Sequence, residues 1–438
     1  METEHSNMQK KHTFFAAAYR RLMEYTDGTV GKIFSLALIL IIVLFALSFL
    51  VKESYATLRI ETKARTFQDD GNYKEAERIL ARGVALYPDS VSMQVALARA
   101  YLEEAQYAPN KAEPRAIEKA RILLLPVEDG ERHESERYTL LGVSHRLKGQ
   151  NKKALSYLEK AVIVDTENAE AFLNTGMILA AYDETKTAQA LFEKAEGILT
   201  DNPRADKNTL ASAHIEIART IFLLANTSKK FEDENENMRA YLEKALGETE
   251  NRALLSRAHY LLSTIYWRAY EFGADDSRDP GDLTRSFDHA KKTIETNQDN
   301  RLGYVAAGRA LIAQRRDLDE ADRYLLVARN MSPNEAIILF HRGEIAFQTK
   351  RYDKALERFK AAVGLLEDGK DRSLSRNDRA SLLAEIFYRA SLIHIANGKQ
   401  DRAVASLREG LRYDPARIKR YIESKKELES VRTYVSAE

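Results

Sequence analysis

The segment from Gly364 to Asp371 comes closest to a catalytic motif in this sequence. It reads Gly-Leu-Leu-Glu-Asp-Gly-Lys-Asp and nearly matches a phosphate-binding P-loop. A P-loop follows a β-strand and needs a Ser or Thr after its lysine to hold magnesium. Here Asp371 takes that position, and the segment follows a predicted helix. We therefore expect no nucleotide site there. The sequence also lacks nucleophile-elbow, zinc-protease and Rossmann motifs.

Metal-ligating residue types occur, but not at the spacing that a metal ion needs. His133-Glu134 is followed by Arg137 where a zinc motif has a second histidine. Four aspartates cluster in a predicted polar loop, at a spacing that does not match a calcium loop. These are Asp275, Asp276, Asp279 and Asp282. The chain has no cysteine, which excludes disulfides and thiolate chemistry. We predict no enzyme activity, no metal and no cofactor.

The remaining aromatic candidates are expected to serve packing. His145 and His394 fall at equivalent inward positions of two predicted helices. A buried histidine with one hydrogen bond explains both better than a metal ligand does. Trp267 lies in the middle of a predicted helix and is expected to belong to the core.

The elements that carry these residues repeat at a fixed spacing. Gly142 and Gly176 are 34 residues apart, and so are Ala154 and Ala188; the same spacing returns within residues 321–362. Small residues at fixed positions let two helices approach closely, and large neighbours fill the space between hairpins. Because one hairpin cannot bury its apolar face alone, such hairpins must stack.

This pattern resembles the tetratricopeptide repeat family. Its small and aromatic positions are clearest in five segments: 57–90, 135–168, 169–202, 336–369 and 384–417. The resemblance implies an all-α fold, a right-handed solenoid of about nine helical hairpins over residues 52–417. Residues 418–438 are predicted to form a capping helix with Ile418, Ile422, Leu428 and Val431 facing inward. Two long polar connections are expected, at Asn226–Asn237 and Gly273–Asp282.

In the resembling family, the first helix of each hairpin lines a concave groove that receives a peptide or a partner helix. Carried over by position, this implies a protein-binding groove formed by Thr139, Leu140, Val143, Arg146, Leu173, Asn174, Met177, Ala181, Phe340, His341, Glu344, Phe347, Tyr388, Arg389, Leu392 and Ile395. Any of these side chains can instead bury against a neighbouring unit. Asn174 matches one position of the clamp that some members use for a C-terminal carboxylate, but the accompanying lysines are absent.

Ile33–Val51 is a run of 19 residues without a charge. A helix of that length reaches about 30 Å, the thickness of the hydrocarbon core of a bilayer. We therefore predict one transmembrane helix over residues 33–51, in contact with lipid. A cleaved signal peptide remains an alternative, because Ser54-Tyr55-Ala56 resembles a cleavage site. In the tail of residues 1–32, Thr13–Tyr25 reads as a short amphipathic helix.

The basic residues flanking this run are nearly balanced, so charge alone does not orient it. A large downstream domain is often translocated, which favours a cytoplasmic N-terminus and a periplasmic solenoid in the inner (cytoplasmic) membrane. The formal net charge of +1 argues against a nucleic-acid partner.

The function we expect is a membrane-anchored scaffold that binds protein partners through its solenoid surfaces. By analogy of fold, it would assemble a bacterial envelope complex of the pilus, flagellar, secretion or outer-membrane type. Two alternatives remain: an enzyme regulator or small-ligand binder that uses the inter-repeat loops, and a homo-oligomer that assembles through the same groove.

Overall fold

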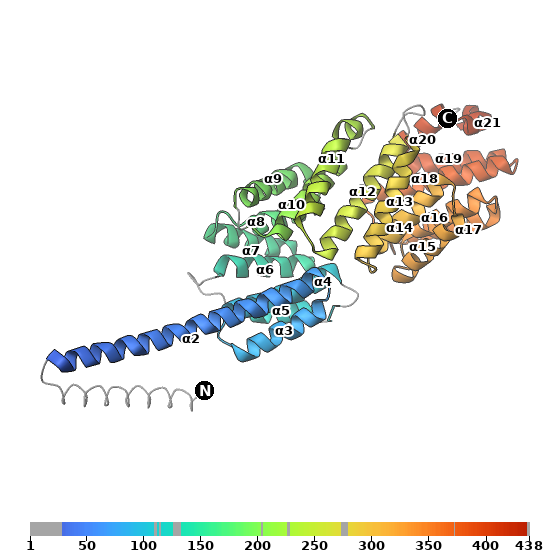
Figure 1. Ribbon diagram of the computed structural model, residues 1–438. Coiled ribbons are helices and arrows are strands. Elements are labelled where there is room, and N and C mark those ends of the chain that lie inside the picture. The colour runs from blue at the N-terminus through green and yellow to red at the C-terminus, as the bar shows by residue number, and fades with distance from the viewer. Residues whose placement is uncertain are drawn as a thin grey trace.

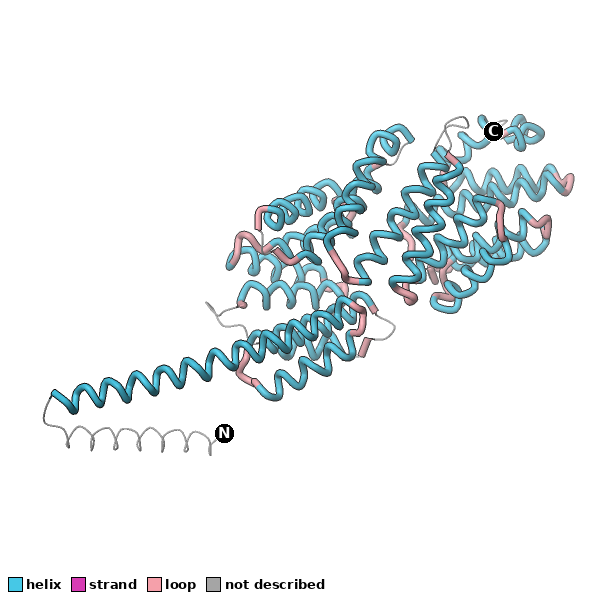
Figure 2. The backbone as a smooth tube through the Cα atoms, in the orientation of Figure 1, coloured by secondary structure: helices cyan, strands magenta, loops and turns pink. Residues whose placement is uncertain are grey.

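Helices make up all regular structure in the part of the chain that the structure describes (Figure 2). The computed structural model describes residues 29–108, 112–113, 115–125, 133–202, 205–225, 228–272, 279–371 and 373–435; of residues 29–35, 46–53, 228 and 272 it describes the backbone alone. The prediction of an all-α solenoid is confirmed (Figure 1).

Consecutive helices pack against each other as hairpins along the chain. The hairpins are α2 (Thr29–Asp69) with α3 (Tyr73–Leu86), α4 (Val91–Tyr107) with α5 (Ala116–Leu124), α6 (Glu134–Leu147) with α7 (Asn151–Val164), α8 (Ala169–Ala181) with α9 (Thr185–Thr200), α10 (Lys207–Leu224) with α11 (Ser228–Glu248), α12 (Arg252–Phe272) with α13 (Pro280–Thr296), α14 (Arg301–Gln314) with α15 (Leu318–Met331), α16 (Ala336–Gln348) with α17 (Tyr352–Glu367), and α18 (Arg376–Ala396) with α19 (Gln400–Tyr413). The chain then closes with α20 (Pro415–Ser424), a 3-10 turn (Lys426–Leu428) and α21 (Glu429–Val435).

The small residues of the repeat set how closely the two helices of a hairpin approach. A Cβ atom added at Gly142 would lie 2.7 Å from Cγ of Leu158 in the facing helix. One added at Gly176 would lie 2.5 Å from the ring of Phe192. A larger residue at either position would push the facing helix away, so these glycines fix the interhelical distance.

Polar side chains join one hairpin to the next. The side chain of Asn168 caps α8 by accepting a hydrogen bond of 2.8 Å from the backbone N–H of Ala171. Its amide nitrogen also donates to Ser135 Oγ at 2.7 Å and to Thr139 Oγ1 at 2.9 Å on α6. One side chain thus caps its own helix and ties it to the preceding hairpin.

Three predictions about connections and ends are wrong. Residues 228–237 belong to helix α11, not to a polar loop, because Phe231 and Met238 lie two turns apart and are both fully buried. The expected connection Gly273–Asp282 is shorter at its far end, where α13 begins at Pro280. The closing segment is two short helices rather than one, although Ile418 and Leu428 are buried as expected.

The first hairpin folds back onto the middle of the chain. At the C-terminal end of α2, the Asp69 carboxylate accepts a hydrogen bond of 2.9 Å from the amide of Asn208 and one of 3.3 Å from the amide of Asn251. Arg65, one turn earlier on α2, forms an ion pair of 3.0 Å with Asp206. We call these contacts the clasp; they connect α2 to the starts of α10 and α12.

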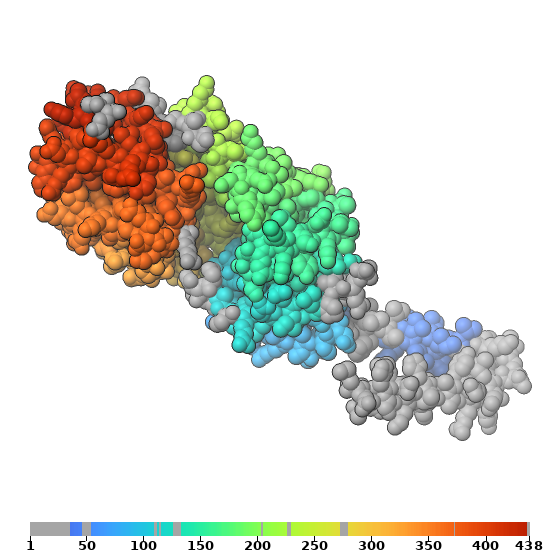
Figure 3. All heavy atoms as spheres, turned by 180° about the vertical axis from the view of Figure 1, so that it is seen from behind, coloured from blue at the N-terminus to red at the C-terminus, as the bar shows by residue number. Residues whose placement is uncertain are grey.

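The other end of α2 projects from the body of the molecule (Figure 1). Seen from the opposite side, its described residues also stand clear of the solenoid (Figure 3). Within the residues that the structure describes, no helix is both long enough and apolar enough to cross a membrane. The predicted span Ile33–Val51 lies within α2, with the side chains of residues 33–35 and 46–51 outside that description. The predicted helix Thr13–Tyr25 lies outside the described residues.

Candidate functional site

The first helices of the hairpins line two grooves of very different size. The N-terminal groove has a volume of about 80 Å³ and is lined by α2, α4, α6, α8, α10 and the start of α12, including Arg65, Arg99, Leu140 and Asn174. The C-terminal groove has a volume of about 800 Å³ and is lined by α12, α14, α16 and α18, including Trp267, Arg309, Phe340 and Glu344. Ligand pockets commonly measure about 300–1,000 Å³, so of these two grooves the second is the one with room for a partner.

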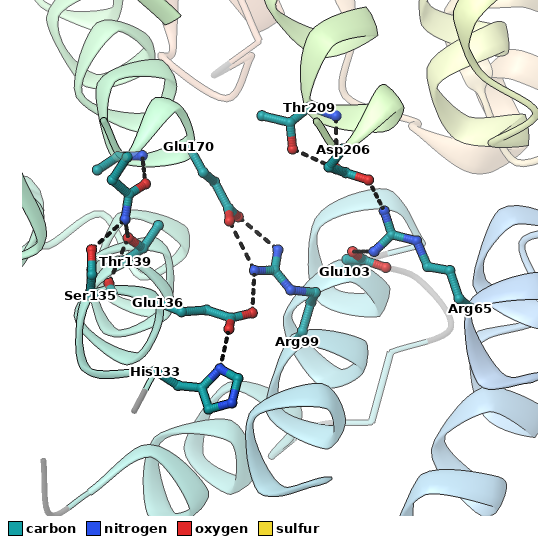
Figure 4. Close-up of polar contacts among 12 residues, drawn as sticks. Arg65, Arg99, Glu103, His133, Ser135, Glu136, Thr139, Glu170, Asp206 and Thr209 are labelled. Atoms are coloured by element: carbon teal, nitrogen blue, oxygen red, sulfur yellow. Dashed lines mark hydrogen bonds and ion pairs between the residues drawn. The ribbon is translucent and has the colours of Figure 1, made fainter. Parts of the chain in front are cut away.

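Ion pairs lie in the N-terminal groove and in a neighbouring cavity of about 540 Å³, which is lined by Arg99, His133 and Glu136 (Figure 4). Arg99 donates to Glu170 at 2.8 Å and 2.9 Å and to Glu136 at 3.0 Å. Glu136 also lies 3.1 Å from Nδ1 of His133. Although burial opposes it, the hydrogen bond from His133 and the charge of Arg99 lower the pKa of Glu136 to about 2. These groups are partnered within the chain.

A second set of contacts lies beside the N-terminal groove. Arg146 donates to the side-chain oxygens of Gln106 at 2.6 Å and Asn174 at 3.2 Å. The clasp closes the groove on the opposite side through Arg65. The polar groups of this groove bind each other and join distant hairpins, which is a structural role.

Apolar side chains form one wall of the C-terminal groove. Phe340 and Phe347 on α16 face it together with Val305 on α14 and Leu382 on α18. Phe347 is half-buried, so part of its ring remains accessible. Such a wall suits the apolar side chains of a peptide or helix from a partner.

Most charges of the C-terminal groove are paired. Nε of Arg389 lies 3.3 Å from Glu344 and 3.2 Å from Glu385. Arg417 lies 3.8 Å from Glu385, and Arg301 pairs with Glu335.

Arg309 differs from these arginines. Its guanidinium carbon lies 4.2 Å from the ring centre of Trp267, and one terminal nitrogen donates to Thr264 Oγ1 at 3.4 Å. Nε of Arg309 is buried without a hydrogen-bond partner, and no carboxylate of the described residues forms an ion pair with this side chain. Burial lowers the pKa of Arg309 below its usual value.

Burial also shifts two titratable groups on α16. It raises the pKa of Glu344 to about 7, because the effect of burial and of the neighbouring Glu385 exceeds that of Arg389. Burial lowers the pKa of His341 to about 3, with a further contribution from the charges of Arg309 and Arg389. His341 is therefore neutral at physiological pH.

The structure divides the predicted groove residues into three sets. Those that line the C-terminal groove are Phe340, His341, Glu344, Phe347 and Arg389. Those that line the N-terminal groove are Leu140, Val143, Leu173, Asn174 and Met177. The others line neither groove: Thr139, Arg146, Ala181, Tyr388, Leu392 and Ile395.

Burial, exposure and packing explain why residues of the third set do not line a groove. Thr139 is fully buried and bonds to Asn168, and Ala181 is exposed at the end of α8. Tyr388, Leu392 and Ile395 pack against the cluster formed by α20 and α21, which cover the last hairpin.

The sequence prediction missed most of the lining of the C-terminal groove, including Trp267 and Arg309. Trp267 was expected in the core, but it is half-buried and lines the groove. Arg309 is the only charged residue between Leu302 and Gln314, in a helix that is otherwise almost entirely apolar. A lone arginine in such a helix was the available signal, because a charge there needs a partner or a ligand.

The rejected motifs have structural roles. Asp371, at the end of the P-loop-like segment, is buried and accepts hydrogen bonds from the backbone N–H groups of Ala336 at 2.7 Å and Ser373 at 2.9 Å. His145 bonds to Gln150 at 2.7 Å and stacks on Tyr157. Across the described residues, no cluster of three or more ligating side chains is arranged to hold a metal ion. Of the aspartate cluster, Asp275 and Asp276 lie outside the described residues.

The fold and the grooves define the class of protein: an all-helical repeat solenoid with a concave inner surface. A family model described as tetratricopeptide repeat matches residues 62–121 and 305–370, and another of the same description matches residues 135–168 and 384–417. These four segments of the chain are tetratricopeptide repeats. A comparison with curated proteins finds no match.

Solved structures of repeat proteins resemble this chain in fold. A monomeric mutant of IFIT1 with Gppp-AAAA matches 86% of this chain and 83% of its own, with a TM-score of 0.50 and 16% identity. The pilF protein of Pseudomonas aeruginosa matches 52% of this chain and 89% of its own, with a TM-score of 0.41 and 16% identity. YrrB, described as a TPR protein with an unusual peptide-binding site, matches 48% of this chain and 93% of its own, with a TM-score of 0.32 and 19% identity.

Proposed function

We propose that this protein is a membrane-anchored scaffold that receives a segment of a partner protein in its C-terminal groove. Tetratricopeptide repeats support a role in protein–protein interaction. The observation that carries the assignment to this groove is its size and lining: about 800 Å³, with apolar side chains on the first helices, of which Phe347 is partly accessible. The N-terminal groove, at about 80 Å³, is filled by its own ion pairs.

The apolar run supports a membrane anchor. Residues 33–51 carry no charge, and the large apolar side chains between Leu36 and Phe45 are exposed on α2, with Phe45 76% exposed. So much contiguous apolar surface is unfavourable in water and is typical of an interaction with lipid or protein. We propose lipid as its environment, in the inner membrane of a bacterial envelope, with the N-terminus in the cytoplasm and the solenoid in the periplasm. We propose that the scaffold takes part in the assembly of an envelope complex of the pilus, flagellar, secretion or outer-membrane type.

Crosslinking tests the groove assignment in the intact protein. A photoreactive amino acid replaces Phe347 in the full-length chain, expressed in its own cells, and crosslinked products are identified by mass spectrometry. The control position is Lys360, exposed on the outer helix α17. Stoichiometric adducts with one protein at Phe347 and not at Lys360 support the proposal, whereas equal or absent adducts at both positions contradict it. An adduct with another copy of the same chain supports self-assembly instead.

Membrane fractionation tests the anchor separately. The full chain should stay in the pellet after an alkaline carbonate wash. A variant with Leu40→Arg and Leu44→Arg should move to the supernatant, because each charge at the centre of a span costs about 2.5–3.5 kcal/mol. A wild-type chain that washes off would contradict the anchor and leave the groove assignment intact.

A further inference from the structure

The charge balance of the C-terminal groove leaves one half-buried arginine without a carboxylate partner among the described residues. Its lining contains five arginines and four glutamates. Arg301, Arg389 and Arg417 each pair with at least one carboxylate. Arg315, at the end of α14, also forms no ion pair with the described residues, but it is exposed to solvent. Arg309 is the cation that faces the groove beside the aromatic wall and has no carboxylate partner among the described residues.

Because Arg309 is partly buried, the absence of a carboxylate partner is energetically unfavourable. A guanidinium with a buried, unbonded N–H loses hydration that the protein does not replace. Trp267 compensates in part, because its ring faces the cation at 4.2 Å. A carboxylate that reached Arg309 would replace the lost hydration and form a charge-assisted hydrogen bond at low dielectric.

The same lining limits which anion can enter. Glu271, Glu344 and Glu385 lie around the groove, so a phosphate dianion or a nucleic-acid backbone would meet as much repulsion as attraction. A single carboxylate matches the excess of one positive charge. The apolar side chains of Phe340 and Phe347 line the same groove, which favours a carboxylate flanked by apolar groups.

We propose that the C-terminal groove recognises a partner segment by one acidic side chain, which pairs with Arg309 above Trp267, while flanking apolar side chains pack against Phe340 and Phe347. This inference rests on the proposed function, because it names the chemistry of the partner in the same groove. The Lys and Asn clamp for a C-terminal carboxylate is absent here; Arg309 and Trp267 form a different kind of anion site.

The test uses a displayed library of random 12-residue peptides against the detergent-solubilised full chain. Selected peptides are synthesised with a fluorescent label, each with a version in which its acidic residue becomes the corresponding amide. We expect the selected peptides to share one acidic position between apolar residues. The amide version should bind wild type about tenfold to a hundredfold more weakly, as expected for a hydrogen bond to a charged group.

A double-mutant cycle assigns that effect to Arg309. In Arg309→Gln, the acidic and amide peptides should bind with nearly equal affinity, because the pairing partner is gone. The matched control is Arg417→Gln, which lines the same groove but removes an arginine already paired with Asp414 and Glu385. It should keep the preference for the acidic peptide. Thermal melting of each variant checks that the fold is retained.

The outcomes separate this inference from the proposed function. Peptides selected without an acidic position, or an acidic preference that persists in Arg309→Gln, overturn the role of Arg309 and leave the groove as a peptide site. A preference that disappears when the peptide C-terminus is amidated also overturns it, because the carboxylate is then terminal. Failure of the wild-type chain to select any peptide contradicts both proposals.

Discussion

Both grooves are lined by the first helices of successive hairpins, but their charged side chains differ in whether they are paired within the chain. In the N-terminal groove, Arg99 pairs with carboxylates on the next two first helices, Glu136 on α6 and Glu170 on α8. In the C-terminal groove, Arg309 lies above Trp267 with no carboxylate beside it. A repeat solenoid can therefore turn one part of its inner surface into structural support and leave another part open for a partner.

The largest effect is expected from breaking the charge network of the N-terminal groove. Arg99→Ala leaves Glu136 and Glu170 without their shared cation in a half-buried site. We expect the free energy of unfolding, measured by urea denaturation, to fall by about 3 kcal/mol. Arg78→Ala is the control, since Arg78 and Glu75 form an exposed pair on one helix and such pairs contribute little to stability. A fall no larger than that of the control would show that the network is not structural.

The C-terminal groove should make stability depend on pH through Glu344. Its folded pKa of about 7 lies above the unfolded value of 4.5, so its stabilising contribution is complete below pH 4.5 and is lost as the pH rises through 7. Relative to Glu344→Gln, wild type should lose about 3 kcal/mol of unfolding free energy across this interval. Glu409→Gln, at an exposed site on α19, should show the same pH dependence as wild type. A difference between wild type and Glu344→Gln that is constant with pH would refute this assignment.

A smaller effect is expected from opening the clasp. Asp69→Ala removes the acceptor for Asn208 and Asn251 and should cost about 1 kcal/mol. Hydrogen exchange should become faster at the end of α2 and at the starts of α10 and α12. Protection of α16 and α18, which lie in the other groove, should stay unchanged. Faster exchange along the whole chain would mean that the clasp supports the entire solenoid rather than the N-terminal groove.

The smallest effect on stability is expected at Arg309. Replacing it with methionine keeps much of the contact with Trp267 and removes a buried N–H that has no partner. The free energy of unfolding should change by less than about 0.5 kcal/mol or rise slightly. A loss of more than about 2 kcal/mol would show that Arg309 is part of the structure, and the contrast between the grooves would then fail.

The repeat could be predicted from the sequence because it depends on local packing. Gly142, Ala154 and their equivalents act within one hairpin, so their spacing reports the fold directly. The polar composition of residues 228–237 concealed a helix, because two buried residues on one face suffice to place it. Length and hydrophobic pattern alone did not reveal the break near Lys425 in the closing segment.

The grooves were harder to predict, because their lining depends on contacts between distant hairpins. Position in the repeat identified the first helices correctly, but it did not show that Arg65 returns to Asp206 or that α20 and α21 cover Tyr388. Which groove stays open is decided by these long-range contacts. A single repeat contains no information about them.

Helix α2 has one further consequence for a scaffold at a bilayer. Its 41 residues form one uninterrupted rod of about 60 Å, which carries both the uncharged run and the clasp residues. If the run is embedded in lipid as proposed, no flexible joint would separate the head groups from Arg65 and Asp69. The solenoid would then be held at a fixed distance from the membrane and in a fixed orientation. Tilting of α2 in the membrane would strain the clasp contacts that close the N-terminal groove.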